Sequence, residues 1–338
     1  MSRLLLSLVL AAGFAGPLHA QIPPQLQPSA QMAASNGDAN DQFGIAVAID
    51  GVTAVVGASG ARTAYIFAED QGGAGQWGQV VELDPEELSG PGIFGGAVAI
   101  SGDTVVVGAQ TASGPPTSVG AVYLFKKDQG GPANWGRVVK LTADVPQVFG
   151  LFGAAVALDG DTLVVGAPGQ NSVYVFRRHQ GGPEAWGQVA VIDADPATGS
   201  ARFGGSLALD GDRILVGAQR DSLDAEDSGA AYLFDRNLGG PESWGQVARL
   251  TADVPADFAE FGDEVALQGT TAVVTATRQD FGRVFIFEEN QGGADAWGLA
   301  YQIEPVDTSA FDFFGQRLAL DGDLLVASAL NDSSEGNS

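Results

Sequence analysis

Four carboxylates fall within seven residues of this chain, at Asp221, Asp224, Glu226 and Asp227. Clustered carboxylate oxygens bind cations or meet the basic groups of a partner. Acidic stretches of the same kind occur at 36–41 and 193–195, and a solvated loop is the simplest interpretation of all three. We predict that the four carboxylates lie in a surface loop, where a binding partner can reach them.

A search for catalytic groups finds one histidine after residue 20, His179, and no cysteine in the whole chain. His179 precedes Gly181, at a place that related stretches give to Asp70, Asp128, Asn237 and Asn290. Polar side chains at such places bind nearby backbone N–H groups, so we predict a turn residue and not a general base. Ser-His-Asp sets and phosphate-binding glycine loops are missing, and cysteine chemistry is excluded. We therefore predict that the chain is not an enzyme and has no cofactor.

The sequence around these residues is repeated along the chain. Phe-Gly recurs at six equivalent places, 51 to 58 residues apart, and each of the five tryptophans stands 17 residues before one of them. Self-similarity at such a period indicates stacked units that bury their apolar faces against their neighbours. The units start near Phe43, Phe94, Phe152, Phe203, Phe261 and Phe314.

Each unit has the pattern of four strands. In the third unit, 152–158 alternates small and branched residues, Asp159–Asp161 gives a hairpin turn, and 162–167 is apolar throughout. Two further strands follow at 173–176 and 188–192. Four short strands per unit favour β-propeller blades over a solenoid of sandwiches. We predict an all-β propeller of four-stranded blades, with five complete repeats and a partial sixth.

One connection alone varies in length between units. The distance from the end of the second strand to the phenylalanine of the third is 9, 16, 9, 16 and 11 residues in the five complete units. Insertions confined to one connection lie on one face of a repeat fold, often the binding face. We predict that loops 110–119 and 221–229 form that face, together with the neighbouring connections from fourth to first strands.

Both ends of the chain depart from the repeat. Residues 1–20 have the order of a secretory signal peptide, with Arg3, the apolar stretch Leu4–Ala15 and a small residue, Ala20, at the cut. We predict a mature domain over 21–338 that is secreted, periplasmic or on the cell surface. No segment has the twenty or so apolar residues of a membrane span.

The first and last strands raise the question of closure. Residues 26–34 align with the fourth strand of the other units, with Met32 in the slot of Leu250, so the N-terminal segment is a candidate closing strand for the last blade. The last unit supplies two strands and then stops at 331–338. We predict a C-terminally truncated chain whose incomplete final blade has an open edge that is prone to pairing.

A few residues depart from the repeat consensus. Asp263 and Glu264 replace small residues, Thr275 replaces a glycine, and Arg317 follows Phe314. Such departures mark active sites in propeller enzymes, but drift in the later units explains them equally well, and neighbouring residues of a strand point to opposite faces. A carbohydrate-active hydrolase or lyase is therefore the alternative hypothesis.

The residues from Phe152 to Pro168, followed by Val-Tyr-Val-Phe and a downstream Trp-Gly, resemble bacterial FG-GAP repeat proteins, relatives of the integrin alpha-chain propeller. The resemblance covers roughly 26–338. It implies a propeller of four-stranded blades that is exported or surface-located, with adhesion or recognition as its role and no catalysis.

The sequence lacks the loop that binds calcium in integrin-type repeats. Those repeats carry a longer acidic loop between the first two strands, whereas this chain has only tight turns such as Asp159–Asp161, Ser101–Asp103 and Gln268–Thr270. Ca²⁺ takes six or more oxygen ligands, and a tight turn does not supply them. We therefore disfavour a calcium site.

The formal net charge is −25, which repels nucleic acid and anionic lipid. Our prediction is a secreted, monomeric recognition or adhesion scaffold that binds a protein or glycan ligand at the loop face. A structural segment of a larger surface protein is a further alternative.

Overall fold

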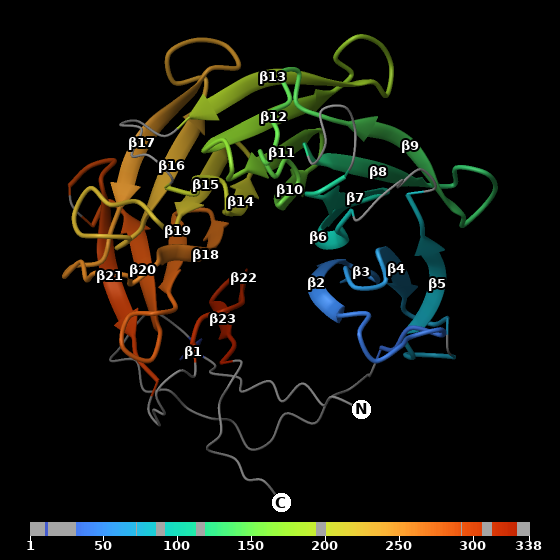
Figure 1. Ribbon diagram of the computed structural model, residues 1–338, viewed down its shortest axis with the longest axis horizontal. Coiled ribbons are helices and arrows are strands. Elements are labelled where there is room, and N and C mark those ends of the chain that lie inside the picture. The colour runs from blue at the N-terminus through green and yellow to red at the C-terminus, as the bar shows by residue number, and fades with distance from the viewer. Residues whose placement is uncertain are drawn as a thin grey trace, which may run out of the picture. The chain divides into compact units, whose positions relative to one another are not determined.

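The computed structural model describes residues 11–12, 32–71, 73–85, 92–112, 119–193, 201–291, 293–305 and 313–329. These residues form strands, turns and loops but no helix. Five sheets have four strands that pair in chain order, and one sheet has three strands (Figure 1). The four-stranded sheets are β2 (Phe43–Asp50) to β5 (Gly78–Leu83), β6 (Phe94–Ser101) to β9 (Trp135–Leu141), β10 (Ala155–Asp159) to β13 (Trp186–Asp193), β14 (Ser206–Asp210) to β17 (Trp244–Leu250), and β18 (Phe261–Gln268) to β21 (Trp297–Ile303).

The second strands of these sheets are β3 (Thr53–Ala58), β7 (Thr104–Ala109), β11 (Thr162–Ala167), β15 (Arg213–Ala218) and β19 (Thr271–Ala276). The third strands are β4 (Thr63–Ala68), β8 (Ala121–Lys127), β12 (Ser172–Arg178), β16 (Ala230–Arg236) and β20 (Arg283–Glu289). The last sheet contains β1 (Ala11–Ala12), β22 (Leu318–Asp321) and β23 (Leu324–Ala327). This confirms the predicted four-stranded repeat unit.

Contacts divide the chain into two compact units. The first comprises Pro28–Ile192 with Met1, and the second comprises Asp193–Ser338 with Ser2–Gln27. The first unit holds the sheets from β2 to β13, and the second holds the sheets from β14 to β23 together with β1. The single domain that we predicted over 21–338 stays a prediction.

A tight turn with a positive-φ glycine closes the first hairpin of each repeat, and in four of the six repeats it is the predicted Asp-Gly. In β10 and β11, Asp159 pairs with Thr162 and Leu158 pairs with Leu163. Gly160 has a φ of 52°, a left-handed conformation that glycine adopts without steric cost. The two-residue turn therefore sets the strand register, and it places every second side chain on the same face of the sheet.

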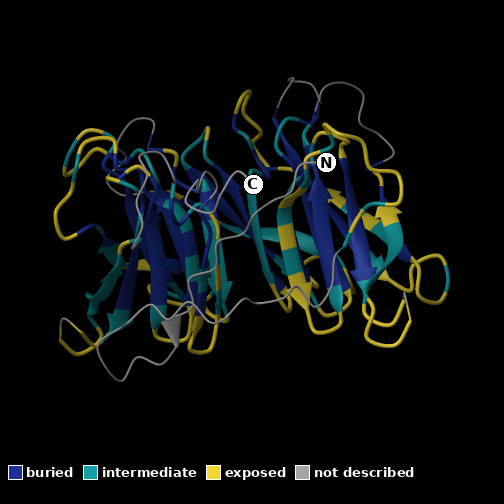
Figure 2. Ribbon diagram, turned by 90° about the horizontal axis from the view of Figure 1, so that it is seen from below, coloured by how far each residue is buried: buried dark blue, intermediate teal, exposed yellow. Residues whose placement is uncertain are grey.

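Within each of the two compact units, neighbouring sheets pack face to face. Phe94 and Tyr123 of the second sheet lie in one buried cluster with Val55 and Ile66 of the first, and the two rings lie 5.6 Å apart in an edge contact. Similar clusters form around the phenylalanines that open later sheets, at Phe152, Phe261 and Phe314. The middle strands are accordingly buried, and exposed residues gather in the loops at the sheet ends (Figure 2).

The tyrosines predicted for the core are buried, with exposed fractions of 6% or less at Tyr65, Tyr123, Tyr174 and Tyr232. The tryptophans are less uniform. Trp135 and Trp244 are buried, whereas Trp77, Trp186 and Trp297 are half-buried. The guanidinium of Arg178 lies 5.3 Å from the centre of the Trp186 ring, so this ring rests under a charged side chain and not in a closed core.

The tryptophans give a stability prediction. Trp244→Ala is expected to lower the free energy of unfolding by about 3 to 5 kcal/mol, because it empties a buried site. Trp186→Ala is expected to cost about half as much, since water and Arg178 already cover part of the ring. Urea denaturation of both variants tests this ranking, and equal losses would contradict it.

Met32 packs as its spacing predicted, but residues 32–34 form no strand, so the predicted closing strand is not confirmed there. Met32 packs with Ala34 against the buried cluster of Ala54, Val56 and Tyr65, as Leu83 packs against Phe94 in the next sheet. In the last sheet, β23 pairs with β22 on one side and with Ala11–Ala12 on the other. The rest of the predicted signal peptide, residues 26–31 and residues 331–338 lie outside the described residues.

Candidate functional site

The predicted acidic loop connects β15 to β16 and is held against a second loop. The N–H of Phe258 donates to the carbonyl of Glu226 at 2.7 Å, and the N–H of Glu260 donates to the carbonyl of Asp227 at 3.2 Å. A side chain adds a further contact, since Asp257 accepts from the N–H of Glu226 at 3.1 Å. Loops 219–229 and 251–260 therefore form one surface of the second unit.

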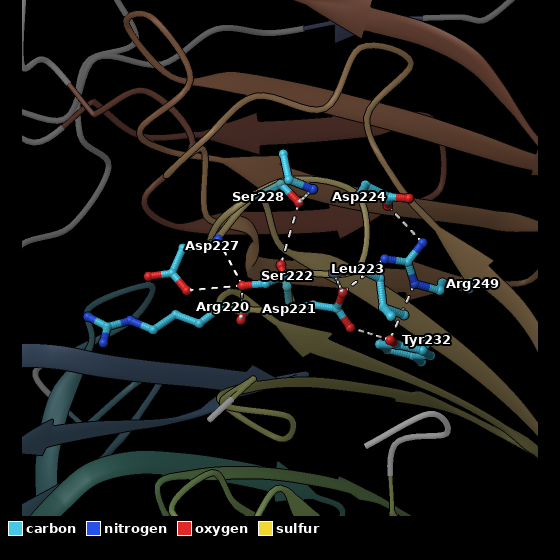
Figure 3. A network of polar contacts seen from close by, with 10 residues as sticks. Arg220, Asp221, Ser222, Leu223, Asp224, Asp227, Ser228, Tyr232 and Arg249 are labelled. Carbon is cyan, nitrogen blue, oxygen red and sulfur yellow. Dashed lines mark hydrogen bonds and ion pairs between the residues drawn. The ribbon is translucent and has the colours of Figure 1, made fainter. Parts of the chain in front are cut away.

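Asp221 is the anchor of this surface and has no exposed area. Its carboxylate accepts hydrogen bonds from the Tyr232 hydroxyl, from Nη2 of Arg249 at 2.9 Å and from the N–H of Leu223 at 3.0 Å (Figure 3). Tyr232 and Arg249 face each other across β16 and β17, so the strand register brings both donors to the loop.

Arg249 links two of the predicted carboxylates. Its Nη1 lies 2.8 Å from Asp224, and its guanidinium lies 5.9 Å from the centre of the Tyr232 ring. Burial, and then the hydrogen bond to Asp221, raise the pKa of Tyr232 to about 12. The Tyr232 hydroxyl therefore stays protonated at physiological pH and donates its hydrogen bond to Asp221. Tyr232 and Arg249 together support the loop from its buried side.

The other two carboxylates, Glu226 and Asp227, lie further along the same loop. The N–H of Asp227 donates to Oγ of Ser222 at 2.9 Å, which tightens the loop, while Glu226 is exposed. We predicted the same exposed position for all four acids. In the structure Asp221 is buried, whereas Asp224, Glu226 and Asp227 are not. It also adds Arg249 and Tyr232, which sequence reasoning missed. The signal for Arg249 was a cation at a strand position that holds Lys140 in the other long-loop repeat and Glu82, Val191 or Gln302 in the remaining ones.

The C-terminal end of the loop predicted at 110–119 makes the same kind of contact in the first unit as its counterpart makes in the second. The N–H of Phe152 donates to the carbonyl of Val119 at 3.3 Å, as the N–H of Phe261 donates to Ser228 at 2.9 Å in the second unit. Residues 113–118 lie outside the described residues. Within the described ranges, no three His, Cys, Asp or Glu residues gather as a metal site requires.

His179 is a turn residue, as predicted. It has a φ of 68°, and its Nδ1 accepts a hydrogen bond from the N–H of Glu184 at 3.1 Å. Asp70, Asp128, Asn237 and Asn290 each accept from the N–H five residues ahead in the same way. The imidazole nitrogen thus replaces a carboxylate or amide oxygen in a repeated turn.

Three of the four departures from the repeat consensus meet in the second unit. Glu264 lies 3.4 Å from Nη1 of Arg317, and its N–H donates to the hydroxyl of Thr275 at 3.1 Å. Asp263 instead accepts from the hydroxyl of Thr277 at 2.8 Å, so the two neighbouring carboxylates have different partners. Burial raises the pKa of Glu264 to about 7, against the opposing effect of Arg317, although 27% of its side chain is exposed.

The raised pKa of Glu264 gives a pH prediction. A carboxyl whose pKa is higher in the folded chain stabilises that state below its ordinary value, 4.5, and the contribution is lost as the pH rises through about 7. Glu264→Gln is therefore expected to flatten the fall in melting temperature between about pH 4.5 and pH 7.5. The exposed Glu69→Gln serves as the control, and identical pH profiles for Glu264→Gln and the unmodified protein would contradict the prediction.

Comparison with known proteins places these sheets in a repeat family. A family model described as "FG-GAP repeat" matches residues 28–74, 77–125, 135–176, 186–234, 244–287 and 297–338. Each match runs from a tryptophan, or the slot of one, towards the third strand of the following sheet. None of the curated proteins matches the chain.

Two solved structures resemble the chain in fold. They are the putative 6-phosphogluconolactonases of Bacteroides fragilis (TM-score 0.51, 12% identity) and Bacteroides uniformis (TM-score 0.52, 13% identity). Each match covers 76% of this chain and 69% of the other. At such identity the likeness extends to the fold alone.

In the described ranges, no helix has the length and apolar character needed to cross a membrane.

Proposed function

Because the chain belongs to the FG-GAP repeat family, we propose that it is a non-enzymatic recognition or adhesion scaffold that binds a protein or glycan through loops 219–229 and 251–260. Export by the N-terminal segment 1–20, and a place outside the cytoplasm, are part of this proposal. The adhesive role extends what the resemblance to integrin-type repeats implies.

The observation that carries the proposal is the network of Asp221, Tyr232 and Arg249 that supports the acidic loop from its buried side. Asp221 is buried against Tyr232 and Arg249, while Glu226 and Asp253 on the adjoining loops stay exposed. A rigid loop loses little conformational entropy on binding, so its exposed groups contribute more fully to affinity. Buried support under exposed polar groups is the arrangement expected of a preorganised contact surface.

The test measures binding of the full chain to surface material from the producing cells. The double variant Glu226→Gln/Asp253→Asn removes two exposed charges from the loop face and is expected to weaken binding about tenfold. The matched control Glu69→Gln/Asp323→Asn removes two exposed charges elsewhere and is expected to leave binding within about twofold. Equal effects of the two variants would refute the choice of face.

A carbohydrate-active enzyme is the second candidate, because Glu264, Arg317 and Thr275 meet although they lie far apart in the sequence. Glycan cleavage by the full chain that Glu264→Ala abolishes would favour this candidate over the scaffold.

A further inference from the structure

Two loops of the chain share a sequence that no other segment repeats. Leu-Thr-Ala-Asp-Val-Pro-x-x-Phe occurs at 141–149 and at 250–258. Each copy follows a sheet whose second and third strands are joined by one of the two long loops. The motif therefore recurs with the two-sheet period, once in each compact unit.

Both copies expose the same apolar side chains. Val145 and Phe149 are each 71% exposed, and Val254 and Phe258 are 68% and 51% exposed. Val148 precedes Phe149 in the first loop, and Leu223 lies on the loop that is hydrogen-bonded to the second; each is 44% exposed. We call these groups the first patch (Val145, Val148 and Phe149) and the second patch (Leu223, Val254 and Phe258). Exposed apolar groups that gather in this way mark interaction sites more often than scattered ones do.

The backbone holds the two phenylalanines outward. Phe149 has a φ of 61° and Phe258 a φ of 60°, in a region that bulky L-residues rarely adopt. Three residues further on, Phe152 and Phe261 fill the core and are 1% and 0% exposed. The exposed rings are thus a second, separate set of aromatics, held in a strained conformation of the kind that clusters at binding sites.

Acidic residues lie in both loops, one in the first and more in the second. Asp144 lies in the first loop and is exposed, as are Asp253 and Asp257 in the second. The second patch also adjoins Glu226 and Asp227, through the backbone bonds from Phe258 and Glu260. Three arginines, Arg278, Arg220 and Arg202, lie close enough to act on the Glu260 carboxylate, and Arg278 is paired with it at 3.0 Å. An apolar centre with an acidic margin is complementary to an apolar side chain flanked by basic residues.

We propose that the two patches are equivalent docking sites for a protein partner that presents apolar side chains flanked by lysine or arginine. This inference rests on the proposed function and assigns its contact residues and partner class. The charge of the margin selects the basic flanks, and the Val-Phe pair supplies the apolar area. Because the motif occurs twice, one chain binds two such segments.

The experiment uses the full chain and two labelled synthetic peptides of equal length, one alternating leucine with lysine and the other leucine with glutamate. We expect two lysine peptides to bind each chain, and no glutamate peptide. Phe149→Asn and Phe258→Asn are each expected to remove one of the two sites, and the double variant to remove both. Asparagine tolerates a positive φ, so these variants keep the loop conformation, and they leave the net charge unchanged.

Leu238→Asn is the matched control, because Leu238 is 48% exposed but lies in the Gly-Gly turn between β16 and β17. It is expected to keep both sites. Lysine-peptide binding by the double variant that equals binding by the unmodified protein would overturn the inference, since net charge alone would then explain it. Binding of the glutamate peptide, or of a glycan in its place, through the same phenylalanines would overturn the partner class.

The two double variants distinguish a failure of the docking patches from a failure of the proposed function. If Glu226→Gln/Asp253→Asn loses binding to the surface material and Phe149→Asn/Phe258→Asn retains it, the acidic face stands and the apolar patches do not. If both variants retain that binding, the proposed face fails together with the inference.

Discussion

Asp221→Asn is expected to lower the free energy of unfolding by about 3 kcal/mol, near the lower end of what removing one member of a buried ion pair costs. The carboxylate has no exposed area and accepts from three donors. An amide in its place leaves the Arg249 guanidinium with Asp224 as its remaining charged partner, and it turns one acceptor into a donor. Urea denaturation followed by circular dichroism measures the loss.

Asp224→Asn is the matched control, because the Asp224 side chain is 34% exposed and a partly solvated pair contributes about 1 kcal/mol or less. A double-mutant cycle with Arg249→Met then isolates the coupling between Asp221 and Arg249. Equal losses for the two aspartate variants would show that burial does not govern this network. For the same reason, we expect a deletion of 221–227 to destabilise the fold as well as the contact surface, which makes point substitutions the better test of binding.

Gly262→Ala is expected to lower the free energy of unfolding by about 4 kcal/mol, from two physical causes. Gly262 has a φ of +90°, and a Cβ built on it would lie 2.4 Å from the carbonyl oxygen of Ala230 in the preceding sheet. The positive φ costs an L-residue about 1 to 2 kcal/mol, and forcing the two sheets apart adds about 1 to 3 kcal/mol.

The first repeat provides the control for Gly262. Gly44 occupies the same Phe-Gly position with a φ of +89°, but a Cβ there would meet no atom within 4 Å. Gly44→Ala is therefore expected to cost only the conformational part, about 1 to 2 kcal/mol. Thermal or urea unfolding of the two variants compares them directly. Equal costs would mean that the backbone conformation, and not the approach of the neighbouring sheet, requires glycine in this motif.

Local signals predicted the repeat unit well. Asp-Gly turns, alternating apolar residues and the regular tryptophan spacing placed the strands, and the structure confirms the turn role of His179 and the packing of Met32. These features depend on residues that are close in the chain or at equivalent places in each repeat. Turn chemistry and side-chain alternation act over a few residues, so a single sequence displays them.

The site required the tertiary structure. Asp221, Asp224, Glu226 and Asp227 look alike in the sequence, yet only Asp221 is buried, because Arg249, 28 residues away, reaches it across β16 and β17. Val145, Phe149, Val254 and Phe258 are apolar like the core residues around them, yet they are exposed, because loop backbones with positive φ turn the two rings outward. Short-range patterns along the chain are enough to predict the strands, turns and buried rings of each repeat. Which charges pair and which apolar groups meet solvent was decided only by strand register and loop packing, since both depend on contacts between residues far apart in the chain.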